Sequence, residues 1–139
     1  MTAPLHETMP PSKPRIQEES WGRMEWLVER RPGGTDPGLS LAVMTVRPGH
    51  QAPRHRHANC TEVLYVTGGR LRICRGDEVI DAAPGDSVLV PKGCPHAAEN
   101  PGPTDTSALI AYSAGRRHYQ LLSSDGQLST CSIDRRPSR

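Results

Sequence analysis

Three side chains that can bind a metal ion lie close together in the stretch PRHRHANCTE, residues 53–62. His55 and His57 are separated by one residue and Glu62 follows five residues later, in a chain of 139 residues with six histidines. In an extended segment, side chains at i and i+2 point to the same face, so both imidazoles can bind one ion from one side. Imidazole and carboxylate groups bind first-row divalent metals. The stretch therefore indicates part of a metal site; the alternative is a pair of solvated histidines on a surface strand.

Glu62 can join this site only if the chain changes direction after His57. Strict alternation along a strand would place Glu62 on the opposite face, so residues 58–61 must turn or bulge. A further ligand is also needed, and His96 is a candidate because it follows the short apolar run SVLV, residues 87–90. The four side chains would then come from segments far apart in the sequence.

The spacing of these residues resembles the two motifs of the cupin superfamily. The first motif is matched by Gly49, five residues, His55-x-His57, four residues, Glu62, six residues and Gly69. The second is matched by Gly85, five residues, Pro91-x-Gly93, two residues, His96, three residues and Asn100. The resemblance spans roughly residues 21–122. It implies that His55, His57, Glu62 and His96 bind one divalent metal ion.

The resemblance also implies a fold: an all-β, single-domain, antiparallel jelly-roll β-barrel, with the two motifs on neighbouring strands and the ion inside its mouth. The composition agrees, because 13 glycines and 14 prolines disfavour long helices and fit short strands joined by turns. We expect a flexible N-terminal arm over residues 1–20, the barrel over 21–122 and a polar C-terminal tail over 123–139.

Apolar runs bounded by turn residues predict the strands. WGRMEWLVE could be a helix or a strand, and the β-rich context favours a strand. Gly68-Gly69 predicts a hairpin turn that pairs EVLYV with RLRIC. KGCPH is expected to be a turn that ends at His96. The other strands are expected at 39–46, 55–57, 79–83, 87–91 and 106–114, with one more at YQLL, residues 119–122.

Charge and hydropathy argue against several classes of protein. The formal net charge is only +2. The pairs Arg30-Arg31 and Arg116-Arg117 lie far apart in the sequence, and these arginines are interpreted as solvated. No nucleic-acid partner is therefore expected. There is no run of 18 apolar residues, so no membrane span is expected. The N-terminus has no apolar signal core, which favours a cytoplasmic protein.

Three imidazoles and one carboxylate leave two positions of an octahedral ion for other ligands. Fe(II) is the first expectation, and Zn(II), Mn(II), Ni(II), Cu(II) or Co(II) also suit these donors. Iron or copper could bind O2 beside a chelating substrate, whereas zinc or manganese would polarise an oxygen atom as a Lewis acid. The leading hypothesis is an enzyme, dioxygenase-like, that oxidises a small molecule in bacterial specialised metabolism.

Two other functions remain open. One is metal-assisted chemistry without net oxidation: rearrangement, cyclisation, isomerisation, elimination or N–N bond formation. The last is considered because H-x-H-x-N-C-x-E-V-L-Y-V and the later S-A-G-R-R are similar to the cupin parts of hydrazine synthetases. The other is a non-catalytic, metal-bearing module that binds a small molecule.

Further candidates lie around the motifs. Glu62 and Tyr112 are the catalytic candidates, although packing is an alternative role for Tyr112. Cys60 and Cys94 lie near the ligands and are interpreted as small buried fillers. An inward-facing arginine would select an acidic substrate, and Arg54, Arg56, Arg70 and Arg72 are candidates for that position. We expect a homodimer.

Overall fold

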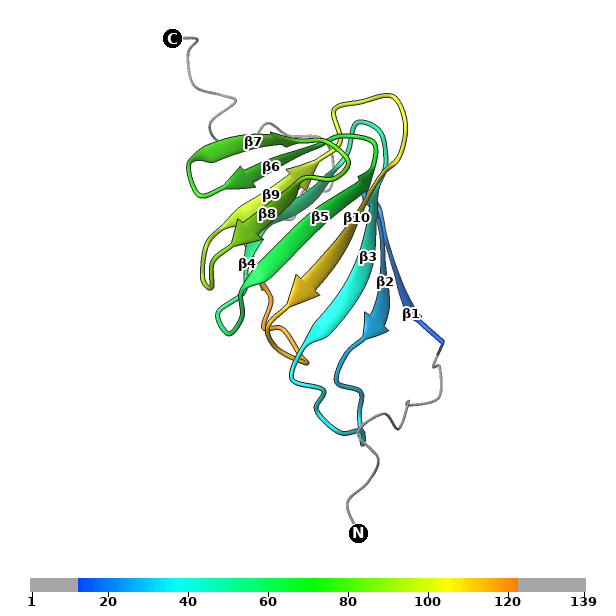
Figure 1. Ribbon diagram of the computed structural model, residues 1–139, viewed down its shortest axis with the longest axis vertical. Coiled ribbons are helices and arrows are strands. Elements are labelled where there is room, and N and C mark those ends of the chain that lie inside the picture. Colours follow the sequence, from blue (N-terminus) through cyan, green and yellow to red (C-terminus); the bar gives the residue numbers. More distant parts are fainter. Residues whose placement is uncertain (1–12, 123–139) are drawn as a thin grey trace.

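The computed structural model describes residues 13–122, which form two antiparallel sheets and contain no helix. The six-stranded sheet has the order β1-β2-β3-β10-β5-β8, and the five-stranded sheet has the order β11-β4-β9-β6-β7. Figure 1 shows the two sheets facing one another as a jelly roll. The strands are β1 (Arg15–Glu19), β2 (Gly22–Val28), β3 (Ser40–Val46), β4 (Gln51–Arg56), β5 (Glu62–Gly68), β6 (Leu71–Arg75), β7 (Glu78–Ala82), β8 (Ser87–Val90), β9 (His96–Glu99), β10 (Thr106–Tyr112) and β11 (Gln120–Leu121).

Alternating side chains build the core between the sheets. In β3, Ala42, Met44 and Val46 are buried while the intervening residues are partly exposed, and β10 follows the same pattern up to Tyr112. The five-stranded sheet contributes buried residues such as Leu71 and Ile73. Burying one face of each sheet removes apolar area from water and fixes the register of both sheets. The expected all-β jelly-roll fold is confirmed.

Most of the expected strands are present, including the stretch 22–28, where a strand was favoured over a helix. Three expectations were wrong. Residues 15–19, placed in the flexible arm, form β1, which pairs along its length with β2. His96 begins a strand, β9, instead of ending a turn. The runs EVLYV and RLRIC do not pair with each other: β5 pairs with β8 and β10, and β6 pairs with β7 and β9.

The last correction concerns the turn at Gly69. Gly69 has φ +70°, a left-handed conformation that glycine adopts without strain. Here the turn carries the chain from the six-stranded sheet to the five-stranded sheet, so it is a corner of the jelly roll. Residues 1–12 and 123–139, which include most of the expected arm and the whole expected tail, lie outside the described residues.

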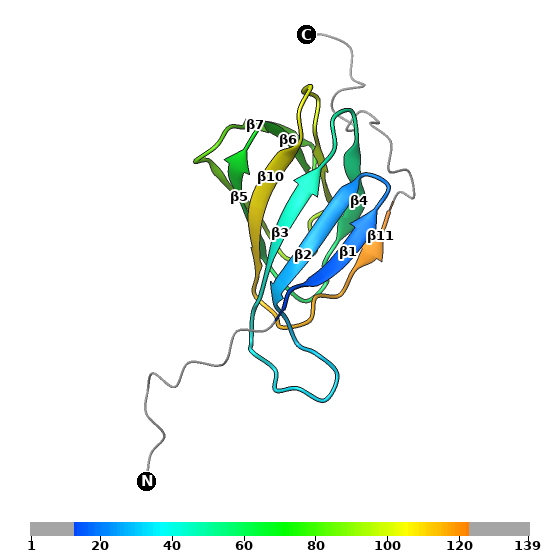
Figure 2. The same ribbon diagram turned by 90° about the vertical axis from the view of Figure 1, so that its right-hand side faces the viewer.

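Strands β1, β2 and β3 form one edge of the six-stranded sheet, seen face-on in Figure 2. The interior between the sheets is therefore bounded at this edge by the N-terminal hairpin. Within residues 13–122 there is no helix long and apolar enough to cross a membrane.

Candidate metal centre

Four side chains converge at one end of the space between the sheets. His55 lies in β4, His57 just after it, Glu62 at the start of β5 and His96 at the start of β9. One ligand atom from each of them lies within 4.8 Å of the others. His55 and His96 are directly opposite in the antiparallel β4–β9 pair, so one sheet supplies the imidazoles and the other supplies the carboxylate.

The connection between β4 and β5 brings Glu62 back towards the histidines. Residues 58–59 form a bend that interrupts the strand conformation, as expected from the alternation of side chains along a strand. Asn59 fixes this bend through its side chain: its amide donates to the Arg116 carbonyl at 2.9 Å, and its oxygen accepts the His118 N–H at 2.7 Å. The chain thus crosses from one sheet to the other within a few residues.

Each histidine is oriented by a main-chain carbonyl. The Nδ1 atom lies 2.6 Å from the Pro53 oxygen in His55 and 2.9 Å from the Cys94 oxygen in His96. In His57 it lies 2.8 Å from the His118 oxygen. A carbonyl only accepts hydrogen bonds, so each Nδ1 carries a proton and each ring directs Nε2 away from that carbonyl. Metal-binding histidines have this arrangement.

The Nε2 atoms point at the Glu62 carboxylate. Nε2 of His57 lies 3.3 Å from Oε1, and Nε2 of His96 lies 3.1 Å from Oε2, with all three side chains almost fully buried. In both rings Nε2 is buried and has no hydrogen-bond partner among the described residues. A cation between these nitrogen and carboxylate oxygen atoms would satisfy both, and the donor set suits a divalent metal. The residues therefore fit the implied ion.

Burial and mutual charge shift the ionisation of these groups. Burial, with the neighbouring His96, lowers the pKa of His55 to about 3. Burial alone would lower the pKa of His96, but the Glu62 carboxylate outweighs it and the pKa is raised. Burial would raise the pKa of Glu62, and the surrounding histidines, His96 first, hold it well below its usual range. Glu62 is thus an anion in the interior, where its charge requires a partner.

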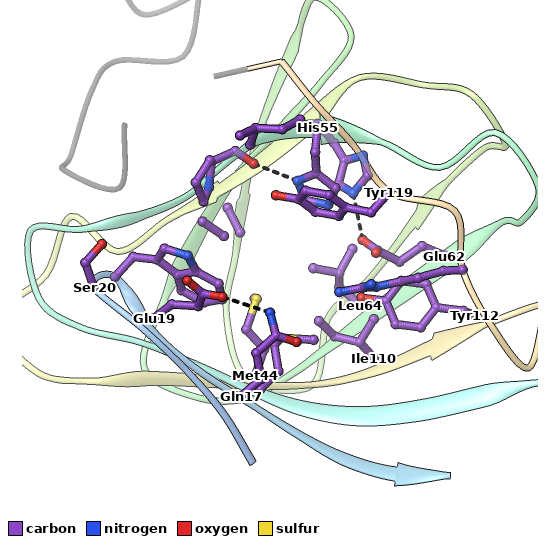
Figure 3. A pocket seen from close by; sticks show the side chains of 18 residues that line it. Gln17, Glu19, Ser20, Met44, His55, Glu62, Leu64, Ile110, Tyr112 and Tyr119 are labelled. Carbon is purple, nitrogen blue, oxygen red and sulfur yellow. Dashed lines mark hydrogen bonds and ion pairs between the residues drawn. The ribbon is translucent and has the colours of Figure 1, made fainter. Parts of the chain in front are cut away.

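A cavity of about 440 Å³ opens beside the cluster. Figure 3 shows His55, Glu62 and Tyr112 on one side of it and Glu19 and Ser20 on the opposite side. Apolar side chains also line the cavity, among them Trp21, Met24, Met44, Leu64 and Ile110. A small organic molecule could lie against these apolar side chains with one end at the metal-capable side chains.

Tyr112, the second catalytic candidate, lies directly across from Glu62 in the β10–β5 pair and lines the cavity. Its ring stacks on Trp26, with centroids 5.7 Å apart, and meets His57 edge-on at 5.3 Å. Burial, and then the Glu62 charge, raise the pKa of Tyr112 well above its ordinary value. Its hydroxyl is therefore a neutral hydrogen-bond donor. The structure supports both packing and a place at the cavity, and the catalytic role stays a prediction.

The cysteines near the ligands are free thiols. Cys60 is buried in the core, and Cys94 is partly buried against it. Burial raises the pKa of Cys60, which keeps it a neutral thiol. Neither sulfur is among the groups that could hold the ion within residues 13–122.

The inward-facing arginine is Arg117, so the expectation that Arg117 is solvated was wrong. Arg54, Arg56, Arg70 and Arg72 are not among the residues that line the cavity, whereas Arg117 is. Arg117 lies beyond the last long strand, in a segment where alternation gives no information. The tyrosine at 119 was also missed: Tyr119 lines the cavity and stacks on His55 with centroids 4.7 Å apart.

Known proteins share both the sequence pattern and the fold. The family described as Cupin domain matches residues 42–112, which include all four metal-capable side chains. Germin-like protein 1 from Brassica napus is 30% identical over 101 residues, covering 69% of this chain and 49% of that protein. Auxin-binding protein ABP19b from Prunus persica is 33% identical over 98 residues, covering 66% of this chain and 46% of that protein. The chain spans about half the length of the curated relatives it matches.

Solved structures show the same architecture at lower identity. Oxalate decarboxylase from Bacillus subtilis superposes with a TM-score of 0.66 and 21% identity, covering 78% of this chain and 29% of that chain. KdgF from Halomonas sp. superposes with a TM-score of 0.62 and 19% identity, covering 74% of this chain and 89% of that chain. At these identities the likeness concerns the fold.

Proposed function

Because the chain belongs to the cupin superfamily, we propose that it is a mononuclear metal-dependent enzyme that acts on a small molecule bound in the cavity. The observation that carries the proposal is the pair of buried Nε2 atoms, in His57 and His96, that face the Glu62 carboxylate and have no hydrogen-bond partner among the described residues. Such groups are costly to bury unless a cation satisfies them. A cavity with an apolar wall lies next to them.

The side chains have distinct roles in this proposal. His55, His57, Glu62 and His96 would hold the ion, and their Nδ1 hydrogen bonds would keep the rings oriented without a large rearrangement. Tyr112 would offer a neutral hydroxyl to the substrate beside Glu62. The apolar wall would exclude water from the reacting group.

The reaction class proposed first is O2-dependent oxidation of the substrate with Fe(II). His55, His57, Glu62 and His96 would hold the ion, and a redox-active ion would supply the capacity to react with O2 beside a bound substrate. The same donor set also suits Zn(II) and Mn(II), which would support a non-redox reaction. The experiment is therefore designed to separate the two classes.

The test begins with metal analysis of protein purified from cells grown with iron, manganese and zinc. Oxygen uptake is then measured for the Fe(II)-loaded protein with a panel of small carboxylates, starting with oxalate, which is part of the name of a structural neighbour. Substrate-dependent oxygen uptake that is lost in His57→Ala supports the proposal. Turnover that continues without oxygen contradicts oxidation and places the reaction in the non-redox class.

Binding without any conversion, by protein that holds stoichiometric metal, would contradict the enzymatic proposal. It would favour the metal-bearing binding module. Protein that takes up no divalent metal from a saturating supply would contradict the whole proposal, because the buried carboxylate and imidazoles would then need another explanation.

We also propose that the protein is a homodimer that associates through the outer face of the six-stranded sheet. Tyr65 in β5 and Leu89 in β8 are 45% and 51% exposed on this sheet. Val63 lies opposite Leu89, and Leu109 lies opposite Tyr65, so apolar side chains are neighbours on this face. Neighbouring exposed apolar side chains are typical of an association surface. In a homodimer the same apolar face of a second copy would cover them.

A further inference from the structure

Arg117 is a charged side chain of the metal cavity that the ligand set does not use. It lines the cavity together with Glu62 and Tyr112. Its guanidinium carbon lies 4.4 Å from the ring centroid of Trp26, 5.3 Å from that of Tyr119 and 5.5 Å from that of Tyr112. Aromatic faces attract a guanidinium and hold it in place. The charge is thus fixed in position before any ligand arrives.

The positive charge of Arg117 has no carboxylate partner among residues 13–122. Two acids line the same cavity, and both have other contacts. Glu62 is in contact with His57 and His96. Glu19 accepts a hydrogen bond from the Gln17 amide at 2.9 Å. Nε of Arg117 is buried and has no hydrogen-bond partner. A guanidinium stays protonated at any working pH, so this is a standing positive charge with an unsatisfied donor.

A second groove on the other side of Arg117 adds to the positive potential. Its volume is about 780 Å³, and Arg117 lines both hollows. Arg15, Arg30, Arg31 and Arg116 also line this groove, with Glu29 as the acid that pairs with Arg15. The arginine pairs that the sequence separates therefore meet in space, partly through the hydrogen bond from the Arg30 N–H to the Gly115 carbonyl. Such a surface attracts anions towards the cavity.

We propose that Arg117 binds the anionic group of the substrate and that the substrate is a carboxylate with an apolar body. This rests on the proposed function and specifies its substrate class. A planar guanidinium matches a carboxylate in a two-point contact. Met44, Leu64 and Ile110 would contact the apolar body. Arg117 is thus a specificity-determining residue, separate from the four that would hold the ion.

The experiment uses benzoate as the probe and benzamide as its neutral counterpart of similar shape. Isothermal titration measures the affinity for each in the full-length wild type, in Arg117→Met, in Arg117→Lys and in Arg116→Met. All four proteins are examined with Zn(II) bound and after removal of metal. Arg116→Met is the matched control because Arg116 is exposed, lines the second groove and does not line the metal cavity.

Arg117→Met is expected to weaken benzoate binding by about 10- to 100-fold, the loss typical of a hydrogen bond to a charged group. Benzamide binding should change little. Arg117→Lys should retain part of the affinity, and Arg116→Met should stay near wild type. An unchanged benzoate affinity in Arg117→Met overturns the proposal. Equal losses of affinity for benzoate and benzamide in this variant also overturn it, as does a wild type that binds benzoate no more tightly than benzamide.

Metal content of the same samples separates this proposal from the proposed function. Arg117→Met should keep the wild-type amount of Zn(II), because Arg117 is not among the metal-capable group. An effect of Arg117 that persists without metal supports the carboxylate contact even if the catalytic proposal fails. If the loss of benzoate affinity in Arg117→Met occurs only together with a loss of Zn(II), the proposed contact between Arg117 and the carboxylate is overturned.

Discussion

At the residue scale, main-chain carbonyls determine how the metal-capable rings point. His55 and His96 each bond to a carbonyl two residues earlier, within their own segment. His57 instead depends on His118, a residue 61 positions later in the chain. Removing a ring should therefore remove a ligand without disturbing its neighbours, since the other two rings keep their own acceptors.

Replacing His57 by alanine should weaken metal affinity by at least about 100-fold. Loss of a hydrogen bond to a metal-binding side chain costs about 10- to 100-fold, and loss of the metal-binding side chain itself should cost more. The fold should persist, because the buried apolar side chains of both sheets are unchanged. Metal content after dialysis and circular dichroism measure the two properties. His118→Ala is the matched control: only its carbonyl contacts His57, so it should keep its metal. Stoichiometric metal in His57→Ala would reject the ligand assignment.

At the scale of elements, the sequence predicted well which metal-capable side chains come together and predicted their surroundings less well. The spacing of His55, His57 and Glu62 indicated the bend between β4 and β5, because strand alternation excludes a straight connection. Strand β9 was missed because HAAE has few β-branched or aromatic residues and follows a turn-like stretch. Strand β1 was missed because RIQEE is polar, and its identity as a strand depends on pairing with β2.

The pairing of strands was less predictable than their existence. Local pattern shows that β5 and β6 are separated by a glycine turn, but tertiary packing decides whether that turn closes a hairpin or crosses between sheets. Arg117 was missed for a related reason: it lies in irregular chain, where no periodicity shows which way a side chain points. Only the folded structure brings it to Tyr112 and Trp26.

The corner at Gly69 gives a prediction for this scale. A Cβ atom there would lie 2.6 Å from Thr106 Cγ2 and 3.0 Å from the Asp105 oxygen, at a φ of +70°. Gly85, with φ +95°, has nothing within 4 Å of such an atom. Gly85→Ala should cost about 1–2 kcal/mol from the backbone alone. Gly69→Ala should cost at least about 1 kcal/mol more, because overpacking adds to the strain. Urea denaturation measures both, and equal losses would contradict the steric contribution.

At the scale of the whole molecule, a bound ion would join the two sheets, since Glu62 comes from one sheet and His55 and His96 come from the other. An ion that binds only the folded state stabilises it by mass action, by about 2.7 kcal/mol at 100 times its dissociation constant. The melting temperature should then rise by about 10 °C on adding metal and fall again with chelator. Calorimetry measures this shift, and an equal rise in His57→Ala would show that the ion binds elsewhere.

The proposed dimer is also tested on the whole molecule. Leu89→Glu places a charge on the apolar outer face, beside Val63, and should convert a dimer to a monomer. Burying an unpaired carboxylate in an interface is costly. Sedimentation velocity gives the mass, and Thr104→Glu, an exposed position between β9 and β10, serves as control. A wild type that sediments as a monomer would contradict the proposal.

The hydrogen bond from His57 to His118 has a consequence for how such a protein could diversify. Every amino acid possesses a peptide oxygen, so the identity of the side chain at position 118 is immaterial to ring orientation. Neighbouring side chains, among them Arg117 and Tyr119, line the cavity, and other side chains at these positions would suit other bound molecules. The length of this stretch has no such freedom: an insertion or deletion between Tyr112 and His118 would shift the acceptor away from the imidazole. Substitutions in this stretch should therefore leave the orientation of the His57 ring unchanged, whereas insertions or deletions should disturb it.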